Sequence, residues 1–455
     1  MIRRLLNIIL VLSLIISITA CQNTNTINSN GSKVVKPGET ELPELTILVT
    51  PNMRNWMKKD CFDNYERQFE KQYGVTVNYE VYGGDYESNV GELMTKLITK
   101  DGPELIIDDW NNAHSLIEQG AVANARDKVP NISKMYESLV DSEAYYIPLG
   151  IGYQPVVLRK DMLEALQLST PNLNWTAEDY YIMRDKWLEQ SNRMFTTFEL
   201  NETNSRYLRE LELFDYRNKK ANINTKELKN ALERIRGEIF SGKYILNKNY
   251  TYKNYYNMLF EYTSQEYEED MELRLSTGYN KQSLRSRSDE SLINLLYAKD
   301  FDSRLGKIVV LPDSIYKDNL LGSLGIMINR NGANLELAYE YVNGLLSNEI
   351  QLEMYEGEES GIYPVNKAIE SKIADIEKKE GYSEETLQLK EFIIRRIEKG
   401  EFQLGALRDM KDHDLYWMLI RDLVKYIFTD KPYSDAELSV ELQKLEDKYN
   451  IILSE

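Results

Sequence analysis

Hydrophobic and polar positions change period in an orderly way near the start of the chain, and these changes predict alternating strands and helices. Short β-rich or alternating runs predict strands, and stretches with apolar side chains at helical spacing predict helices. Gly74 is placed to end the first helix. The order strand, helix, strand, helix, strand is typical of a parallel sheet in an α/β fold. In sequence, these elements are predicted over residues 45–50, 56–73, 75–82, 86–98 and 104–108.

The rest of the chain is mostly helical in pattern. Residues 145–158 have a strand-like pattern, but their glycines and prolines favour a crossing between two lobes over the middle of a sheet. Helices are predicted through most of 160–299, with Thr176 as an N-cap, and throughout the C-terminal part. The remaining predicted elements are strands at 306–312 and 321–329 and a helix at 335–346.

The first residues have the pattern of a bacterial lipoprotein signal. Two arginines precede a predominantly apolar stretch at 5–16, and a small residue precedes Cys21. This stretch is too short and too close to the cleavage position to be a stable membrane span. We therefore expect residues 1–20 to be removed and Cys21 to carry a lipid that holds the protein on the extracytoplasmic face of the cell membrane. Residues 21–43 are polar and without apolar periodicity, which predicts a flexible tether.

The charge and the cysteine content exclude several classes of partner and cofactor. The net charge is −18, and it becomes −20 when the two arginines leave with the signal. A body this acidic is repelled by nucleic acid and by anionic lipid. Besides Cys21 the chain has Cys61, which lies in a helical run of apolar residues and is predicted to fill a core. The two histidines have no recognisable metal or triad spacing, so we expect no metal and no cofactor.

The carboxyl ends of the predicted parallel strands carry the sharpest candidate chemistry, because ligands bind at these ends in such sheets. Asp108 and Asp109 end the third strand and are followed by Trp110 and Asn111. Hydrogen-bond acceptors beside a flat apolar ring suit the hydroxyls and the C–H face of a sugar. The alternative is that Asp109 caps a helix and Trp110 packs into a lobe. The ligand-binding candidates in this part of the chain are Asn52, Tyr82, Asp85, Asp108, Trp110 and Asn111.

Several short segments follow one another in a particular order along the chain. They are LTILVT, FEKQYGVTVNYEV, LMTKLITKDGPELII, LIEQGAVANA, YYIPLGIGYQPVVLRKDMLEAL, NWTAEDY, GKIVVLP with GSLGIMIN, AYEYVNGLLSNEIQLEMY, GIYPVNK and FTDKPYSDAELSVELQKLEDKY. In this order and spacing the chain resembles extracellular solute-binding proteins of ATP-binding-cassette (ABC) importers, the maltose-binding-protein-like group. The resemblance covers nearly all of the chain after the tether.

This resemblance implies a two-lobed α/β fold of the periplasmic-binding-protein type, with a hinge and a ligand cleft between the lobes. The lobes of such proteins close on their ligand. The first lobe is expected over 44–149 and 308–362, and the second over 150–307 and 363–455. The resemblance further implies a monomer that captures a small solute, with an oligosaccharide as the favoured class, and delivers it to the subunits of an ABC permease.

The resemblance adds two aromatic candidates and leaves two differences. Trp417 matches in position a cleft aromatic of the sugar-binding members, although a lone tryptophan in an apolar helix is equally suited to a core. Tyr262 is the second candidate. Glu104 replaces an aspartate that is usual in the family, and Leu158-Arg159 replaces a Tyr-Asn pair, which together count as the first difference; the second is that residues 194–249 match poorly. Because those residues fall in a lobe that helps to select the ligand, the ligand's identity stays open.

Two other functions were weighed against solute binding. Asp108 and Asp109 are neighbours on one strand, so they point to opposite faces and cannot flank one scissile bond as a glycosidase pair does. The chain also has no glycine-rich phosphate loop and no GxSxG motif, so we expect no enzyme activity. A ligand sensor that serves a membrane kinase would keep the same fold, and the sequence does not separate sensing from transport.

Overall fold

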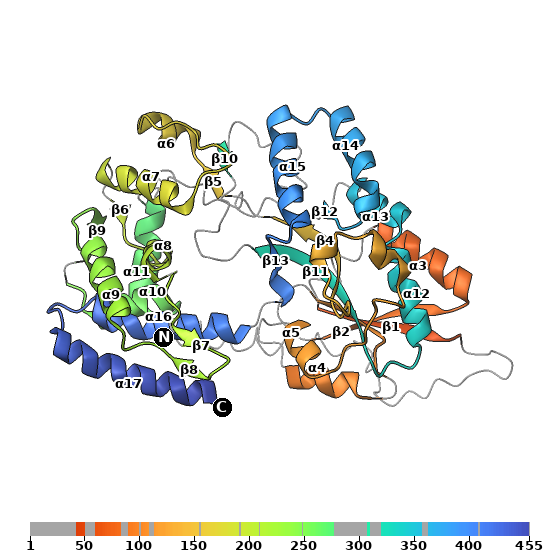
Figure 1. The fold of residues 1–455 in the computed structure, drawn as a ribbon, viewed down its shortest axis with the longest axis horizontal. Coiled ribbons are helices and arrows are strands. Elements are labelled where there is room, and N and C mark those ends of the chain that lie inside the picture. Colours follow the sequence, from red (N-terminus) through yellow and green to blue (C-terminus); the bar gives the residue numbers. More distant parts are fainter. Residues whose placement is uncertain are drawn as a thin grey trace, which may run out of the picture. The chain divides into compact units, whose positions relative to one another are not determined.

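The computed structural model contains two sets of packed elements, each around its own hydrophobic core, which we call the first lobe and the second lobe (Figure 1). Labels of helices and strands follow Figure 1. The residues that the structure describes are 42–50, 60–82, 90–99, 102–108, 113–153, 156–190, 193–208, 210–247, 249–276, 307–309, 320–356, 363–407 and 410–454.

The first lobe is built on a mixed sheet of seven strands. The strand order is β12, β4, β11, β3, β1, β2, with β13 paired to β11. β1 is parallel to β2 and to β3, whereas β11 is antiparallel to β3 and to β4. These strands are β1 (Glu44–Val49), β2 (Thr76–Val81), β3 (Leu105–Asp108), β4 (Ile147–Gly152), β11 (Leu320–Ile328), β12 (Tyr363–Pro364) and β13 (Gln403–Leu404).

Helices surround this sheet and cover its apolar side chains. Phe62, Tyr65 and Phe69 form the buried stripe of the first of them, and Gly74 ends that helix in a left-handed conformation with a φ of 66°. The predicted helix at 56–73 is thus confirmed from Asp60 onward, and residues 56–59 lie outside the described part. The helices of this lobe are α3 (Asp60–Tyr73), α4 (Val90–Leu97), α5 (Ala113–Glu118), α12 (Leu335–Leu345), α13 (Asn348–Glu356), α14 (Glu370–Lys379) and α15 (Glu384–Glu398).

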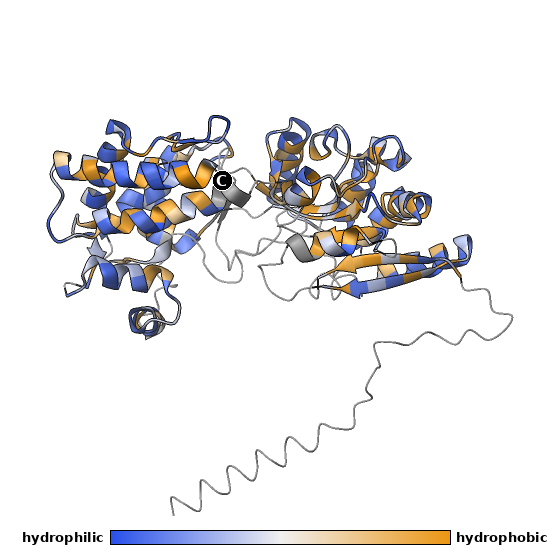
Figure 2. Ribbon diagram, turned by 90° about the horizontal axis from the view of Figure 1, so that it is seen from below, coloured by the Kyte–Doolittle hydropathy of each residue, from blue (hydrophilic) through white to orange (hydrophobic). Residues whose placement is uncertain are grey.

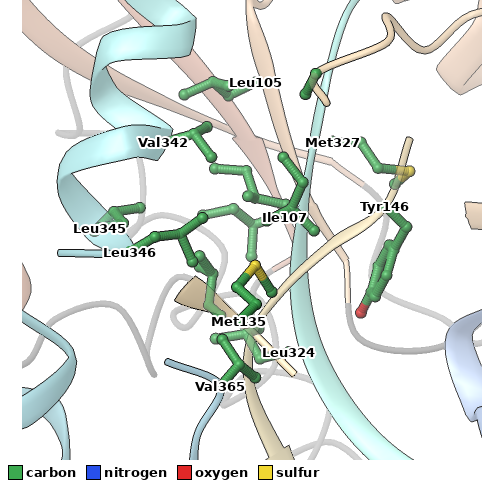
Figure 3. Close-up of a cluster of buried hydrophobic side chains, with 14 of the residues drawn as sticks. Leu105, Ile107, Met135, Tyr146, Leu324, Met327, Val342, Leu345, Leu346 and Val365 are labelled. Carbon is green, nitrogen blue, oxygen red and sulfur yellow. The ribbon is translucent and has the colours of Figure 1, made fainter. Parts of the chain in front are cut away.

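Burial along β1 explains why the parallel part of the sheet forms. Leu45, Ile47, Leu48 and Val49 are all fully buried, as expected for a strand covered on both faces. Figure 3 shows apolar side chains of β3, β11 and α12 meeting in this core. Figure 2 agrees with this burial, because hydrophobic colour runs along the strands of the sheet whereas the helices carry both hydrophobic and hydrophilic residues. The predicted βαβ arrangement is therefore confirmed.

The strand β4 lies inside the sheet, between β11 and β12. The prediction that residues 145–158 form a crossing is therefore wrong for this strand. The sheet tolerates Pro148 because Pro148 faces Gly325, next to a register shift in β11. The chain leaves the sheet only after Gly152.

Glu104, where the sequence departs from the family pattern, has a structural role at the start of β3. It is buried, and its carboxylate accepts hydrogen bonds from the backbone N–H of Thr46 at 2.8 Å and from Nδ2 of Asn334 at 3.3 Å. These contacts join β1, β3 and the start of α12. The glutamate that stands in place of the family's usual aspartate is therefore accommodated by hydrogen bonds within the first lobe.

The second lobe is mainly helical, and its described strands form three short two-stranded sheets. Thr176 caps α7: its hydroxyl accepts from the backbone N–H of Asp179 at 3.2 Å, and the Asp179 carboxylate accepts from the backbone N–H of Thr176 at 2.7 Å. The predicted N-cap is thus confirmed. The helices are α6 (Lys160–Ala165), α7 (Ala177–Gln190), α8 (Thr197–Leu208), α9 (Lys226–Ile239), α10 (Tyr252–Phe260), α11 (Gln265–Ser276), α16 (Met410–Ile427) and α17 (Asp435–Ser454). The strand pairs are β5 (Val156–Leu158) with β10 (Lys307–Val309), β6 (Arg193–Met194) with β9 (Tyr244–Ile245), and β7 (Phe214–Asp215) with β8 (Lys220–Ala221).

The stretch from Tyr363 to Ala406 packs into the first core, whereas the sequence division placed 363–455 in the second lobe. The second core resumes only at Leu415. The reason is the pairing of β12 with β4, which holds the helices that follow β12 beside the first sheet. None of the helices that the structure describes is both long and apolar enough to cross a membrane.

Candidate ligand-binding site

The carboxyl ends of three adjacent parallel strands meet at one edge of the first sheet. Val49 at the end of β1 is in register with Val81 of β2 and with Ile107 of β3. The backbone N–H of Tyr82 donates to the carbonyl oxygen of Val49 at 3.0 Å, and Asp108 is the last residue of β3. The backbone positions of Tyr82 and Asp108 therefore lie on either side of the end of β1.

The side chain of Tyr82 packs inward at this edge. It is 4% exposed and belongs to the first core, so in this structure it supports the edge from within the lobe. A local alternation of polar and apolar residues could not reveal this, because Tyr82 follows the strand and its orientation depends on the elements packed around it. The other predicted residues of this lobe, Asn52, Asp85, Trp110 and Asn111, lie outside the described residues.

The two aromatic candidates of the second lobe lie near the contact between α10 and α16. Trp417 lies on α16, half-buried against the second core, and its neighbour Met418 is 40% exposed. Tyr262 follows the end of α10 and is 71% exposed, with its ring edge-to-face with Tyr267 at a centroid distance of 5.2 Å. Tyr262 is therefore a surface residue, and Trp417 presents part of its indole to the solvent.

A cation–aromatic contact joins the two helices that carry these candidates. The guanidinium carbon of Arg421 lies 5.3 Å from the ring centroid of Phe260, the last residue of α10. Arg421 is one turn beyond Trp417 on α16, and Tyr262 is two residues beyond Phe260. Arg421 and Phe260 were not among the candidate site residues predicted from the sequence. The spacing of Trp417 and Arg421 on one helix was readable, but the packing of α16 on α10 was not.

The poorly matched segment 194–249 forms a polar interior in the second lobe. Arg184 of α7 is 1% exposed, and its guanidinium lies 2.9 Å from Glu202 of α8 and 2.7 Å from Glu238 of α9. It also donates to the hydroxyl of Tyr244 at 2.6 Å and to that of Thr203 at 3.1 Å. In the described structure, residues of this segment therefore pack around the buried guanidinium group of Arg184.

The electrostatics of this interior follow from burial and charge together. Burial alone would raise the pKa of Glu238, but Arg184, Thr203 and Arg206 outweigh it and hold the pKa below its usual range. Burial opposes the charge of Arg184 as well, yet Tyr244, Glu238 and Glu202 keep its pKa well above the ordinary value. The pair of Arg184 with Glu238 is thus charged at neutral pH, and the contacts of Arg184 join α7 to α8 and α9.

The pKa of Asp270, on α11, shifts in the opposite direction to that of Glu238. Burial raises the pKa of this carboxyl, and the nearby guanidinium of Arg274 lowers it only in part. In the described part of the chain, no group of three or more histidine, cysteine, aspartate or glutamate side chains is arranged to hold a metal ion. The carboxylates of Glu202, Glu238 and Asp270 are therefore interpreted as ion-pair partners of arginines.

Two lobes with separate cores, a mixed sheet whose three adjacent parallel strands end at one edge, and repeated passages of the chain between the lobes define a class of α/β binding proteins. The family described as bacterial extracellular solute-binding protein matches residues 65–382. The chain belongs to this family. No relative was found among curated protein sequences.

Solved structures of solute-binding proteins have the same fold at low sequence identity. A putative oligosaccharide periplasmic-binding protein from Synechococcus sp. MITs9220 is 13% identical, with a TM-score of 0.55 over 90% of this chain and 99% of its own. The cyclic α-maltosyl-1,6-maltose binding protein from Arthrobacter globiformis is 14% identical, with a TM-score of 0.54 over 90% and 99% of the two chains. An ABC substrate-binding protein from Listeria monocytogenes in complex with cycloalternan is 14% identical, with a TM-score of 0.52 over 91% and 100%. The predicted fold, two-lobed and of the periplasmic-binding-protein type, is confirmed.

Proposed function

We propose that this protein captures a small saccharide outside the cytoplasm and delivers it unchanged to an ABC permease. The observation that supports the saccharide assignment is that the two aromatic candidates belong to helices that pack against each other: Tyr262 follows α10, and Trp417 lies on α16. An exposed tyrosine and a partly exposed indole offer flat apolar faces to the C–H side of a sugar ring, at a small cost in side-chain entropy. One neighbour of the same fold is described in complex with cycloalternan, and another as a cyclic α-maltosyl-1,6-maltose binding protein, which supports a saccharide as the class of ligand.

The first lobe is proposed to supply the polar half of the site. Asp108, at the end of β3, would accept hydrogen bonds from sugar hydroxyls, together with Asn52, Asp85 and Asn111. Trp110 would add a second flat face, while Tyr82 would support the sheet edge. The side chains proposed to contact the ligand are acidic, amide or aromatic, and these types favour a neutral sugar over an anion.

A saccharide panel tests this proposal. The full chain is heated with maltotriose, cyclic tetrasaccharides, cello-oligosaccharides and xylo-oligosaccharides, and with amino acids and dipeptides as non-sugar controls. A bound sugar raises the melting temperature, because binding to the folded state adds about 2.7 kcal/mol of stability at a hundredfold excess over Kd. Stabilisation by a dipeptide alone would reject the saccharide class while keeping solute binding.

Substitution of Trp417 localises the site. Trp417→Ala is expected to weaken the binding of the stabilising sugar by at least about tenfold, as is common for a packed aromatic anchor. Tyr216→Ala is the matched control, because Tyr216 is an exposed aromatic of the same lobe that directly follows β7. Equal binding by both variants would place the sugar elsewhere.

The lipid anchor is proposed from the signal alone. Cys21→Ser should release the protein into the medium or the soluble envelope fraction, since one or two acyl chains supply the membrane affinity. A variant that still sediments with membranes after a high-salt wash would contradict lipid anchoring at Cys21.

A further inference from the structure

The described chain alternates between the two cores and passes from one to the other at least three times. It belongs to the first core up to Tyr153, to the second from Leu158, to the first again from Leu321, and to the second again from Leu415. Each passage therefore has one end fixed in the first lobe. These ends are the last residue of β4, the start of β11 and the residues after β13.

The three first-lobe ends are joined by strand pairing. Gly152, which ends β4, pairs with Gly322 of β11, and Leu321 of β11 pairs with Leu404 of β13. β11 therefore lies between β4 and β13 near its first residues, and Figure 1 shows these three strands next to one another. A change at this level would act on the three connections together.

A buried aromatic and cationic cluster covers the same place. Tyr153 directly follows β4 and Phe402 directly precedes β13, and their rings meet edge-to-face at a centroid distance of 5.4 Å. The guanidinium carbon of Arg396, on α15, lies 5.1 Å from the ring centroid of Phe402 and 5.7 Å from that of Phe392. Arg396 is 7% exposed, and its Nε donates to the carboxylate of Glu401 at 2.6 Å.

This arrangement is costly to disturb. A guanidinium that is buried, paired with a carboxylate and stacked on two rings loses several interactions at once if the segment before β13 shifts. In domain closure a few connecting residues absorb the change in φ and ψ, while the elements on either side move as rigid bodies. The cluster therefore makes the first-lobe side of the connections rigid.

We propose that Tyr153, Phe402 and Arg396 form an anchor cluster that positions the first-lobe ends of the inter-lobe connections and thereby sets the distribution of lobe orientations in the ligand-free protein. The three are positioning residues, and none of them is assigned to the sugar. The proposal rests on the proposed function only in requiring two lobes that move. Its test needs no sugar, so a failed saccharide panel would leave it standing.

The test measures the distance between the lobes by pulsed electron spin resonance. The full chain carries Cys21→Ser and Cys61→Ala, with spin labels at Lys71→Cys on α3 and Glu233→Cys on α9, both of which are exposed positions. We call the chain with these four substitutions the parent. In the parent without ligand, we expect a narrow distribution of the distance between the two spin labels. Arg396→Met should broaden the distribution and shift its centre, while the melting of the chain stays cooperative.

Arg395→Met is the matched control, because Arg395 precedes Arg396 on α15 but is exposed and pairs only with Glu391 and Glu398 among the described side chains. It should leave the distribution unchanged. If Arg396→Met does not fold, Arg396→Lys carries the test, since it keeps the charge and removes the planar stacking. A folded Arg396 variant with the distribution of the parent would show that the cluster is core packing without influence on lobe orientation.

Discussion

Gly344 shows at the scale of one residue how closely two helices of the first lobe approach. Tyr65 of α3 reaches across α12, and its hydroxyl donates to the carbonyl oxygen of Tyr341 at 2.7 Å. A Cβ atom at Gly344 would lie 2.1 Å from that hydroxyl oxygen. The glycine therefore makes room for the buried hydrogen bond of Tyr65. The sequence shows a glycine inside an apolar helix but not the tyrosine that crosses it.

Gly344→Ala is expected to lower the free energy of unfolding by about 1–3 kcal/mol, because the added methyl group overpacks the contact. Gly237→Ala is the control, since a Cβ at this helical glycine meets nothing within 4 Å. It should raise the free energy of unfolding by about 0.5–1 kcal/mol through helix propensity. Urea unfolding measures both. If Gly344→Ala is as stable as Gly237→Ala, the close approach of Tyr65 to α12 is incorrect.

Glu238 links the stability of the second lobe to pH. Its carboxyl has a lower pKa in the folded chain than the ordinary value of 4.5, as described above. The stabilisation that it provides is therefore complete above about pH 4.5, and it is lost as the pH falls through the lower, folded pKa. Asp270 acts in the opposite sense, because its raised pKa favours the folded state at low pH.

Glu238→Gln should reduce the free energy of unfolding at pH 7 by about 3 kcal/mol, since it removes one charge from a buried pair with Arg184. The loss of stability below pH 4.5 should also become shallower than in the unmodified chain, while the contribution of Asp270 stays the same in both. Glu189→Gln, at an exposed position that pairs with Lys243, is the control and should change little. Parallel pH profiles for Glu238→Gln and the unmodified chain would contradict the lowered pKa.

At the scale of elements, α17 holds a segment of the second lobe that has few backbone partners of its own. The carboxylate of Glu446 accepts from the backbone N–H of Ile223 at 3.0 Å and of Asn224 at 2.9 Å. Asn450 accepts from the backbone N–H of Ala221 at 2.7 Å. One side of the C-terminal helix therefore completes the hydrogen bonds of the chain that leaves the short strand β8.

Removal of the Glu446 carboxylate should affect the backbone at residues 223 and 224, which lie far from α17 in the sequence. Glu446→Ala leaves two partly buried N–H groups without an acceptor, and we expect a loss of about 1–3 kcal/mol. Asp447→Ala is the control on the same helix, because Asp447 is exposed and accepts only from Gln443 among the described residues. Hydrogen exchange should quicken at Ile223 and Asn224 in the first variant alone. Unchanged exchange there would remove α17 from this role.

Elements with a clear local period could be predicted from the sequence, and those held by distant partners could not. β1, β2, β3 and α3 follow the expected alternation of strand and helix. In parallel βαβ units, the period of the hydrophobic residues distinguishes strands from helices, and glycines mark where the elements end. β4 was missed because Pro148 and its glycines indicate a break, whereas the register shift in β11 opposite Pro148 accommodates the proline within the sheet.

At the scale of the whole molecule, the resemblance predicted the family and the two-lobed fold, and the division between the lobes was only partly predictable. Residues 363–406 join the first lobe through the pairing of β12 with β4, a contact that no local pattern encodes. Around the candidate site, too, only the features set by strand order could be predicted from the sequence. The strand ends converge as the topology requires, but the inward packing of Tyr82 and the contact of Arg421 with Phe260 depend on tertiary packing.

Binding of a neutral saccharide and its release unchanged can be measured together. The full chain is titrated in a calorimeter with the saccharide that most raises its melting temperature, and the recovered sugar is then analysed by chromatography. We expect saturable binding at one site, about tenfold or more weaker in Trp417→Ala, and recovery of the intact sugar. Recovery of a shorter product, or saturable binding only of a charged solute, would contradict the proposed function.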